Sequence, residues 1–299
     1  MLGKILVPLD GSKLSEAALG PGTELAAAFA SELHLLGVCE GSDESYRRLM
    51  ETYLVAKAEE ARRSLSGTPV SVKTAAECGE PAGRIIDYAT KQRVGLLVVV
   101  SHGHSGIMPW TMGGTANKIV HGASMPVLLL RAAAAKKRSP QKSIFSKVLL
   151  PLDGSAAGEA ALSLVLEIAA VLKAQVILLT VIESSRRVHT IGGLDSIRFP
   201  DQEVEKTKLA LSDYLDCVVR KFSDRGVEAR REMRSGQAAE EILKLAKTAG
   251  ATLVAMSSHG KSGLREWVFG SVSNKVLHAG KTHLLLVRPA PDAELSCPR

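Results

Sequence analysis

The chain of 299 residues contains no apolar run approaching the roughly 20 residues that a membrane-spanning helix needs. Residues 1–7 are too few for a secretory signal and instead predict a first strand. Aromatic residues are scarce, at 4% of the sequence, and they are not interleaved with basic residues as in proteins that bind single-stranded nucleic acid. We therefore expect a cytoplasmic protein that has no membrane partner, and we disfavour nucleic acid as a ligand.

Motifs of several catalytic classes are missing as well. The sequence has no Walker-type phosphate loop, no Gly-x-Ser-x-Gly nucleophile elbow and no dense carboxylate cluster for two-metal hydrolysis. His102 and His104 look like part of a metal site, but no third ligand follows at a recognisable spacing. We expect no catalytic residue and no metal site, and we expect the loop histidines to form local hydrogen bonds.

Cysteine is rare too. The four cysteines, Cys39, Cys78, Cys217 and Cys297, are scattered and form no Cys-x-x-Cys pair. This usage is typical of reduced thiols in a cytoplasmic protein. Cys297 lies in a polar tail, where we expect a free and exposed thiol.

Positive charge is concentrated in one segment. The formal net charge is +7, and most of the excess comes from Arg131, Lys136, Lys137, Arg138, Lys142 and Lys147, with no acidic residue among them. Such a run predicts a solvated basic linker over 134–146. Contact with nucleic acid or acidic lipid is the less favoured alternative.

Two motifs occur twice in the chain. Val-Pro-Leu-Asp-Gly-Ser at 7–12 returns as Leu-Pro-Leu-Asp-Gly-Ser at 150–155, and Ser-His-Gly at 101–103 returns at 258–260. The repeat predicts a first domain over 1–133 and a second over 147–290. The second half is longer after its second strand, which predicts a long loop in or near 184–200, functional or mobile.

Each half alternates strands with helices. The first half is predicted to contain strands over 5–9, 33–38, 70–76, 96–100 and 127–130 and helices over 15–31, 45–65, 81–93 and 114–122, and the second half repeats this order. Such alternation implies a mostly parallel sheet with right-handed crossovers on both faces. We predict an α/β fold of two tandem doubly wound domains, each with a five-stranded mostly parallel sheet.

The most informative stretch follows the apolar run 253–256. It turns polar and glycine-bearing at Gly260 and ends at Gly270 and Ser271, which open a helical pattern. A strand, a small-residue loop and a helix start form an anion cradle, because backbone N–H groups and the helix dipole attract phosphate. In doubly wound sheets ligands bind beyond the carboxyl ends of strands where the strand order reverses. Asp153 and this loop can therefore share one crevice.

These motifs resemble those of the universal stress protein family, and the chain looks like two such domains in series, with the adenine nucleotide alpha hydrolase-like fold. The nucleotide-binding branch of that family uses Gly-x-x-Gly-x9-Gly followed by Ser or Thr. The second half matches with Gly260, Gly270 and Ser271, and Ser257 stands for the first glycine. In the first half Val100 stands there and Gly114 replaces the hydroxyl residue. The resemblance therefore implies a degenerate first site and an intact second one.

The resemblance and the chemistry together assign a nucleotide site in the second domain. Main-chain amides and hydroxyls would hold the phosphates, Asp153 would lie near ribose or adenine, and an apolar slot would hold the base. The assigned residues are Pro151, Leu152, Asp153, Val181, Met256, Ser257, Gly260, Gly270, Ser271, Val272 and Ser273. The weaker first-domain candidates are Pro8, Leu9, Asp10, Val38, Gly103, Gly113 and Thr115. Lys261 and Arg265 are expected to be solvated surface charges, with an approach to the phosphate tail as the alternative. Trp110 and Trp267 are expected to pack under the loops.

The favoured function is a stress-response regulator that binds ATP, with ADP or AMP open and a divalent cation beside the phosphates as an option. The alternatives are a structural or chaperone-like interaction module without nucleotide, and a weak ATP-hydrolysing enzyme. The resemblance also implies pairing of the two domains through their last strands, with a homodimer as a further assembly.

Overall fold

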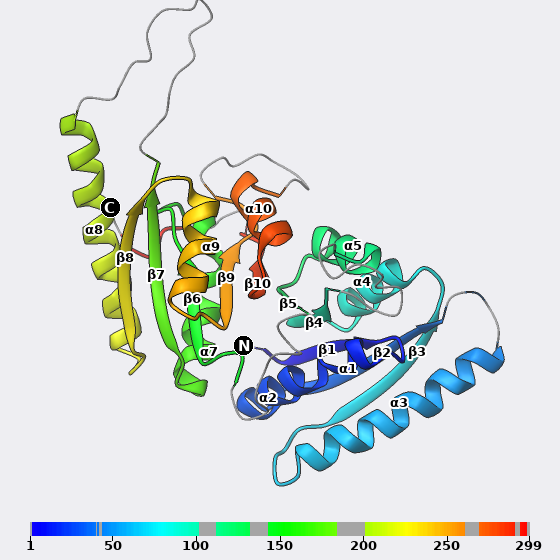
Figure 1. Cartoon of the computed structure of the whole chain (residues 1–299). Coiled ribbons are helices and arrows are strands. Elements are labelled where there is room, and N and C mark those ends of the chain that lie inside the picture. The colour runs from blue at the N-terminus through cyan, green and yellow to red at the C-terminus, as the bar shows by residue number, and fades with distance from the viewer. Residues whose placement is uncertain are drawn as a thin grey trace, which may run out of the picture. The chain divides into compact units, whose positions relative to one another are not determined.

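The computed structural model describes residues 2–39, 41, 44–101, 112–131, 143–183, 201–260, 269–290 and 294–297, with the backbone alone at 201–204. Figure 1 shows its helices and strands. The chain divides into two compact units. The first comprises Met1–Ile144, Leu264–Phe269 and Lys281–Arg288, and the second comprises Phe145–Gly263, Gly270–Gly280 and Pro289–Arg299.

The first unit is built on a mostly parallel sheet. Its strands are β1 (Lys4–Leu9), β2 (Glu32–Cys39), β3 (Val72–Cys78), β4 (Leu96–Val100), β5 (Val127–Leu130) and β10 (His283–Val287). They lie in the order β3-β2-β1-β4-β5-β10, and every pair is parallel except β5 with β10. The strand order reverses between β1 and β4, so the predicted doubly wound sheet is confirmed. In sheets of this kind, ligands bind beyond the carboxyl ends of the strands at the reversal.

Helices cover both sides of this sheet. They are α1 (Lys13–Glu16), α2 (Leu19–Phe29), α3 (Glu44–Ser64), α4 (Pro81–Lys91) and α5 (Gly114–Gly122). Figure 1 shows α2 and α3 on one side of the sheet and α4 and α5 on the other. This arrangement follows from right-handed crossovers that run in opposite directions from the first strand.

Local sequence explains where these elements begin and end. The predicted strand 96–100 is β4, whose Leu-Leu-Val-Val-Val run is almost wholly buried, as in a strand covered on both faces. Helix α4 begins with Pro81 in its first turn, and the Glu80 carboxylate caps it by accepting from the Gly83 N–H at 2.6 Å. The predicted helix 114–122 is α5, which Gly113 precedes in extended conformation.

One predicted helix, 15–31, is instead two. The Ser12 hydroxyl accepts from the Ser15 N–H at 3.1 Å, which starts the short α1 before the predicted boundary. Pro21 then stands in the first turn of α2, where its missing N–H costs nothing. In one continuous helix its ring would collide with the carbonyl of Ala17, so the chain breaks between α1 and α2.

The last strand of the chain, β10, belongs by its contacts to the first unit. It lies antiparallel to β5, with Leu285 opposite Leu128. The Arg131 N–H donates to His283 Nδ1 at 3.1 Å, and burial lowers the pKa of Arg131 to about 10. β10 therefore covers the edge that β5 would otherwise expose.

The second unit repeats the arrangement with four parallel strands instead of the predicted five, because β10 pairs with β5 in the first unit. They are β6 (Lys147–Pro151), β7 (Gln175–Ile182), β8 (Ala229–Ser235) and β9 (Leu253–Ser257), in the order β9-β6-β7-β8. The helical elements are η1 (Ala157–Ala161), α7 (Leu162–Leu172), α8 (Asp201–Ser223), α9 (Ala238–Thr248) and α10 (Ser271–Ala279). Tyr214 and Phe222 of α8 are wholly buried against this sheet. Among the described helices of both units, none has the length and apolarity to cross a membrane.

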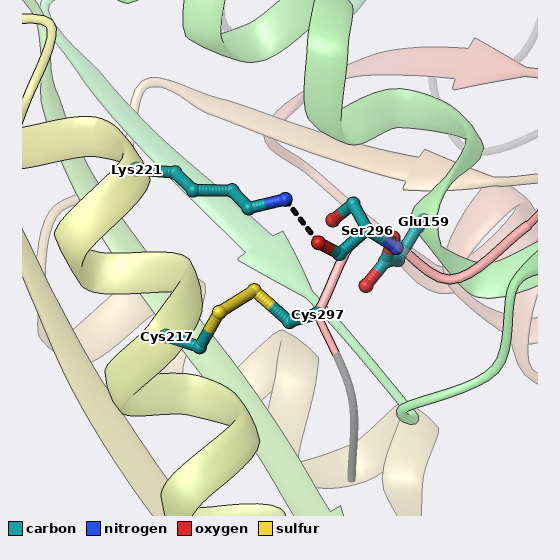
Figure 2. Close-up of a disulfide and its surroundings, with 5 residues drawn as sticks. All are labelled: Glu159, Cys217, Lys221, Ser296 and Cys297. Atoms are coloured by element: carbon teal, nitrogen blue, oxygen red, sulfur yellow. Dashed lines mark hydrogen bonds between the residues drawn. A yellow bond between two sulfur atoms is a disulfide. The ribbon is translucent and has the colours of Figure 1, made fainter.

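The prediction of four reduced thiols is wrong for one pair. Cys217 of α8 forms a disulfide with Cys297, whose Cα lies 6.1 Å away although the two residues are 80 positions apart (Figure 2). Cys297 is wholly buried rather than exposed. The pairing escaped sequence reasoning because no local spacing marks two cysteines that only the fold of the C-terminal tail brings together. Cys39 and Cys78 are free thiols.

Candidate functional site

Strand β6 leads into a turn that is fastened to its neighbour β7. The Leu152 N–H donates to the carbonyl of Leu179 at 2.8 Å, and the Thr180 hydroxyl donates to the carbonyl of Leu152 at 2.8 Å. Leu152 and Thr180 are both buried. The residue that follows, Asp153, is therefore presented at the carboxyl edge of the sheet by a rigid backbone.

The Asp153 carboxylate organises the turn into η1. Its Oδ1 accepts from the Ser155 N–H at 2.9 Å and from the Ser155 hydroxyl at 2.6 Å, while that hydroxyl accepts from the Gly158 N–H at 2.9 Å. A Cβ on Gly158 would lie 2.2 Å from Oδ1, so this turn requires glycine. Asp153 Oδ1 thus holds Ser155, whose hydroxyl accepts from the N–H in the first turn of η1, while Oδ2 is the second oxygen of the carboxylate.

That second oxygen faces the glycine loop. A Cβ on Gly260 would lie 2.5 Å from Asp153 Oδ2, so the loop backbone passes directly over the carboxylate. The structure therefore brings together two features that lie far apart in the sequence, the aspartate after the first strand of the repeat and the loop after its fourth strand.

The loop closes onto the end of β9. The Gly270 N–H donates to the carbonyl of Ser258 at 2.9 Å, and a Cβ on Gly270 would come within 3.4 Å of that oxygen. Gly260 lies two residues beyond Ser258, so both glycines belong to the same strand end. Gly270 directly precedes α10, whose first amides have no acceptors within the helix.

Ser273 has a different role from the predicted one. Its hydroxyl donates to the carbonyl of Ser258 at 2.6 Å, with the carbonyl of Gly270 also at 2.9 Å, and the residue is buried. A hydroxyl has one proton, which is committed inside the loop. Ser273 therefore anchors the loop rather than donating to a phosphate, whereas Ser271 is exposed at the helix start.

Two loop residues make local contacts. His259 Nδ1 lies 2.9 Å from the Ser258 hydroxyl, and the His259 N–H donates to the Ser257 hydroxyl at 3.2 Å. The expected local bonding of this histidine is confirmed. Ser257 itself is buried, so the position of the family's first glycine is used for holding the loop.

The predicted apolar slot is only partly open. Pro151 and Val181 are half-buried at the ends of their strands, while Leu152 and Met256 are buried, with 3% and 6% of their surfaces exposed. The first pair can contact a flat base directly, and the second pair can offer only an edge.

The first unit has the same frame with fewer polar groups. Asp10 Oδ1 accepts from the Ser12 N–H at 2.9 Å, and the Gly113 N–H donates to the carbonyl of Ser101 at 2.8 Å. Ala116 stands where Ser273 anchors the second loop, and Gly114 stands where Ser271 is exposed. The remaining first-unit candidates, Pro8, Leu9, Val38 and Thr115, lie at the ends of β1 and β2 and in the first turn of α5.

Sequence reasoning missed a hollow of about 650 Å³ in the first unit. Its lining residues are Gly41, Gly79, Glu80, Pro81, Gly114, Thr115 and Lys118. The Lys118 ammonium lies 2.9 Å from Glu80 Oε1, which ties α5 to the cap of α4. Of these, only Thr115 was a predicted site residue. The others line the hollow because the fold brings them together, and no sequence motif marks them.

Several expectations lie outside the described residues. They are Gly103, Trp110, Lys261, Arg265, Trp267 and the long loop 184–200. Within the described ranges, no cluster of three or more His, Cys, Asp or Glu residues could hold a metal ion.

Known proteins share this repeated arrangement. The sequence model of the universal stress protein family matches residues 1–131 and again residues 145–288. The chain belongs to the universal stress protein family. It is a tandem member, because the two matches follow one another along almost the whole sequence.

Relatives of this universal stress protein include both tandem and single-domain proteins. A universal stress protein of Mycobacterium tuberculosis is 24% identical over 95% of this chain and 96% of its own length. The universal stress protein YxiE of Bacillus subtilis is 33% identical over 48% of this chain and all of its own length. The crystal structure of a universal stress protein from Archaeoglobus fulgidus shares the fold, with a TM-score of 0.68, 17% identity and coverage of 97% of this chain and 100% of that one.

Proposed function

We propose that this universal stress protein binds an adenine nucleotide at the carboxyl edge of the second unit, with ATP preferred over ADP or AMP. The observation that carries the proposal is the loop closure at Ser258, which sets Gly270 and the amides of α10 beside the Gly260 backbone. Amides at a helix start and a backbone without side chains are the groups that bind phosphate.

The other groups of the site suit the rest of the nucleotide. Asp153 is an acceptor and would repel phosphate, so we place it against the ribose hydroxyls, which donate hydrogen bonds. Pro151 and Val181 offer half-buried apolar surface for the base. A divalent cation would have to be held largely by phosphate oxygens and water, since Asp153 is the one described carboxylate at this loop.

We assign regulation rather than chemistry to the bound nucleotide. The described site supplies amides, hydroxyls and one carboxylate that is already engaged by Ser155. Binding would then change shape or partner choice, and the first unit, which lacks the counterparts of Ser271 and Ser273, would bind more weakly. A cytoplasmic location, domains over 1–133 and 147–290 joined by a basic linker, pairing through the last strands and a homodimer complete the proposal.

The test is a calorimetric titration of ATP into the full chain and two variants. Ser271→Asp adds an acid at the exposed start of α10, where it favours the helix but repels phosphate. Gly114→Asp makes the matched change at the exposed start of α5. We expect Ser271→Asp to weaken ATP at least tenfold, about 1.4 kcal/mol, and Gly114→Asp to leave the main binding event unchanged.

Other outcomes would support the alternatives. No heat of binding with any adenine nucleotide would favour an interaction module without nucleotide. In Gly260→Val the new side chain would collide with Asp153 and disrupt the site. Steady phosphate release by wild type that this variant abolishes would therefore favour an ATP-hydrolysing enzyme. Equal ATP affinity in wild type and Ser271→Asp would place the phosphates elsewhere.

A further inference from the structure

Two free cysteines lie side by side in the first unit. Cys39 ends β2, Cys78 ends β3, and the two residues are direct partners in the parallel register. Partner residues in a parallel pair point to the same face of the sheet, and neighbouring strands are about 4.8 Å apart. That spacing lies within the Cα separations that a disulfide spans.

The side chains of the pair interact but differ in their access to solvent. Burial first, and then the neighbouring Cys78 thiol through charge and a side-chain hydrogen bond, raise the pKa of Cys39. Cys39 is wholly buried, whereas Cys78 is half-buried. The Gly79 N–H donates to the carbonyl of Cys39 at 2.9 Å, which holds the two strand ends in register.

The charge of a nearby guanidinium acts on the pair. Arg47 of α3 has its Nε shielded from solvent without a hydrogen-bond partner, and its charge acts on Cys39 to lower the pKa that burial raises. Its acidic neighbours are Glu44, with an Nη2 to Oε1 distance of 3.0 Å, and Glu51, 3.9 Å from Nε. A nearby cation favours the thiolate, which is the reactive form of cysteine.

We propose that Cys39 and Cys78 form a thiol–disulfide exchange site in the first unit, with a low-molecular-weight disulfide as oxidant. The Cys78 thiolate attacks the oxidant RSSR, which gives a mixed disulfide at Cys78 and releases one thiolate. Cys39 then loses its proton and attacks Cys78 Sγ, which forms the Cys39–Cys78 bond and releases the second thiol. The protein dithiol is oxidised by two electrons, and one RSSR is reduced to two RSH.

The dithiol lies in the first unit, whereas the proposed nucleotide site and the Cys217–Cys297 disulfide lie in the second. Gly41 and Gly79, which follow the two cysteines, line the 650 Å³ hollow of the first unit. In the second repeat the partner residues at the same strand ends are Ile182 and Ser235. The dithiol is therefore a feature of the first unit, independent of the Cys217–Cys297 disulfide and of the proposed nucleotide site.

The experiment is a time course of the full-length protein with oxidised glutathione, quenched by alkylation and mapped as unreduced peptides. Wild type should accumulate a peptide pair linked through Cys39 and Cys78. Cys39→Ser should stop with a glutathionyl group on Cys78, and Cys39→Ala repeats this measurement without a buried hydroxyl. Arg47→Gln should slow formation of the link several-fold, while Arg48→Gln, an exposed neighbour on the same helix, should not.

Two results would overturn the proposal. In the first, wild type accumulates the glutathione adduct of Cys78 without the linked peptide, as the Cys39 variants do. In the second, neither Cys39 nor Cys78 reacts although the protein remains folded by circular dichroism. Peptide mapping keeps both results separate from any exchange at Cys217 and Cys297.

Discussion

The disulfide of the second unit makes a quantitative prediction about stability. Replacing Cys217 by serine opens a covalent loop whose ends are 80 residues apart. In the chain-entropy treatment, a loop of that length stabilises the folded state by about 4.5 kcal/mol. This figure applies if the C-terminal tail stays docked when the bond is absent.

The structure sets a lower value if the tail is released. The tail is held by the disulfide, by the Ser296 N–H to Glu159 Oε2 at 2.7 Å, and by the Lys221 ammonium on the carbonyl of Ser296 (Figure 2). After release, the folded state regains the conformational freedom of the 10 residues after Val287, the end of β10, up to Cys297 (297 − 287 = 10). The loss of stability then depends on the ratio of the 80-residue loop of the unfolded chain to this 10-residue segment. The loss is then about 2 kcal/mol, from a term in (3/2)RT ln n.

Thermal unfolding with and without reductant measures this loss. A change of 2 kcal/mol corresponds to a fall in Tm of about 4–8 °C for a domain of this size. We expect that fall, or a larger one, in Cys217→Ser, the same fall in reduced wild type, and no further effect of reductant on the variant. Cys78→Ser removes a half-buried free thiol and should change Tm little. A Cys217→Ser protein with the Tm of oxidised wild type would refute the reasoning.

Two further predictions concern the first-unit core and the aspartate turn. Burial lowers the pKa of His34 below its usual 6.5, so its contribution to the free energy of unfolding is fully present above pH 6.5 and is lost as the pH falls towards the lowered pKa. Urea unfolding at pH 7 and pH 5 should show this loss of stability. An equal loss in His34→Gln would assign it to other groups. Gly158→Ala forces a Cβ to within 2.2 Å of Asp153 Oδ1, so it should lower the free energy of unfolding by about 1–3 kcal/mol and weaken ATP binding. Gly20→Ala in α2, where a Cβ meets open space, should be neutral or stabilising. Similar melting curves for the two variants would contradict the geometry.

Most of the fold could be predicted because its signals are local. The apolar run of β4, and the Gly113 and Gly270 entries into α5 and α10, each mark an element within a few residues. The doubly wound order follows from alternation and handedness, which need no distances. The break between α1 and α2 was not predicted, because small and apolar residues continue on both sides of Pro21 and are compatible with a single helix.

The arrangement of the candidate site could be predicted in outline, but the hydrogen bonds of its individual atoms could not. Sequence spacing marked Asp153, Gly260 and Gly270 as neighbours, since the ends of parallel strands meet at one edge. The inward hydroxyl of Ser273 depends on the position of the Ser258 carbonyl, which no motif encodes. The Cys217–Cys297 pair depends in the same way on where the C-terminal tail runs.

Hydrogen exchange of the full-length chain with and without saturating ATP tests the central claim most directly. If the loop amides bind phosphate, ATP should protect peptides that contain Gly260 and the Gly270–Ser271–Val272 segment, with weaker or no protection at Gly113 and Thr115. Unchanged exchange at Gly270–Ser271–Val272, under conditions where calorimetry shows ATP to be bound, would contradict the account.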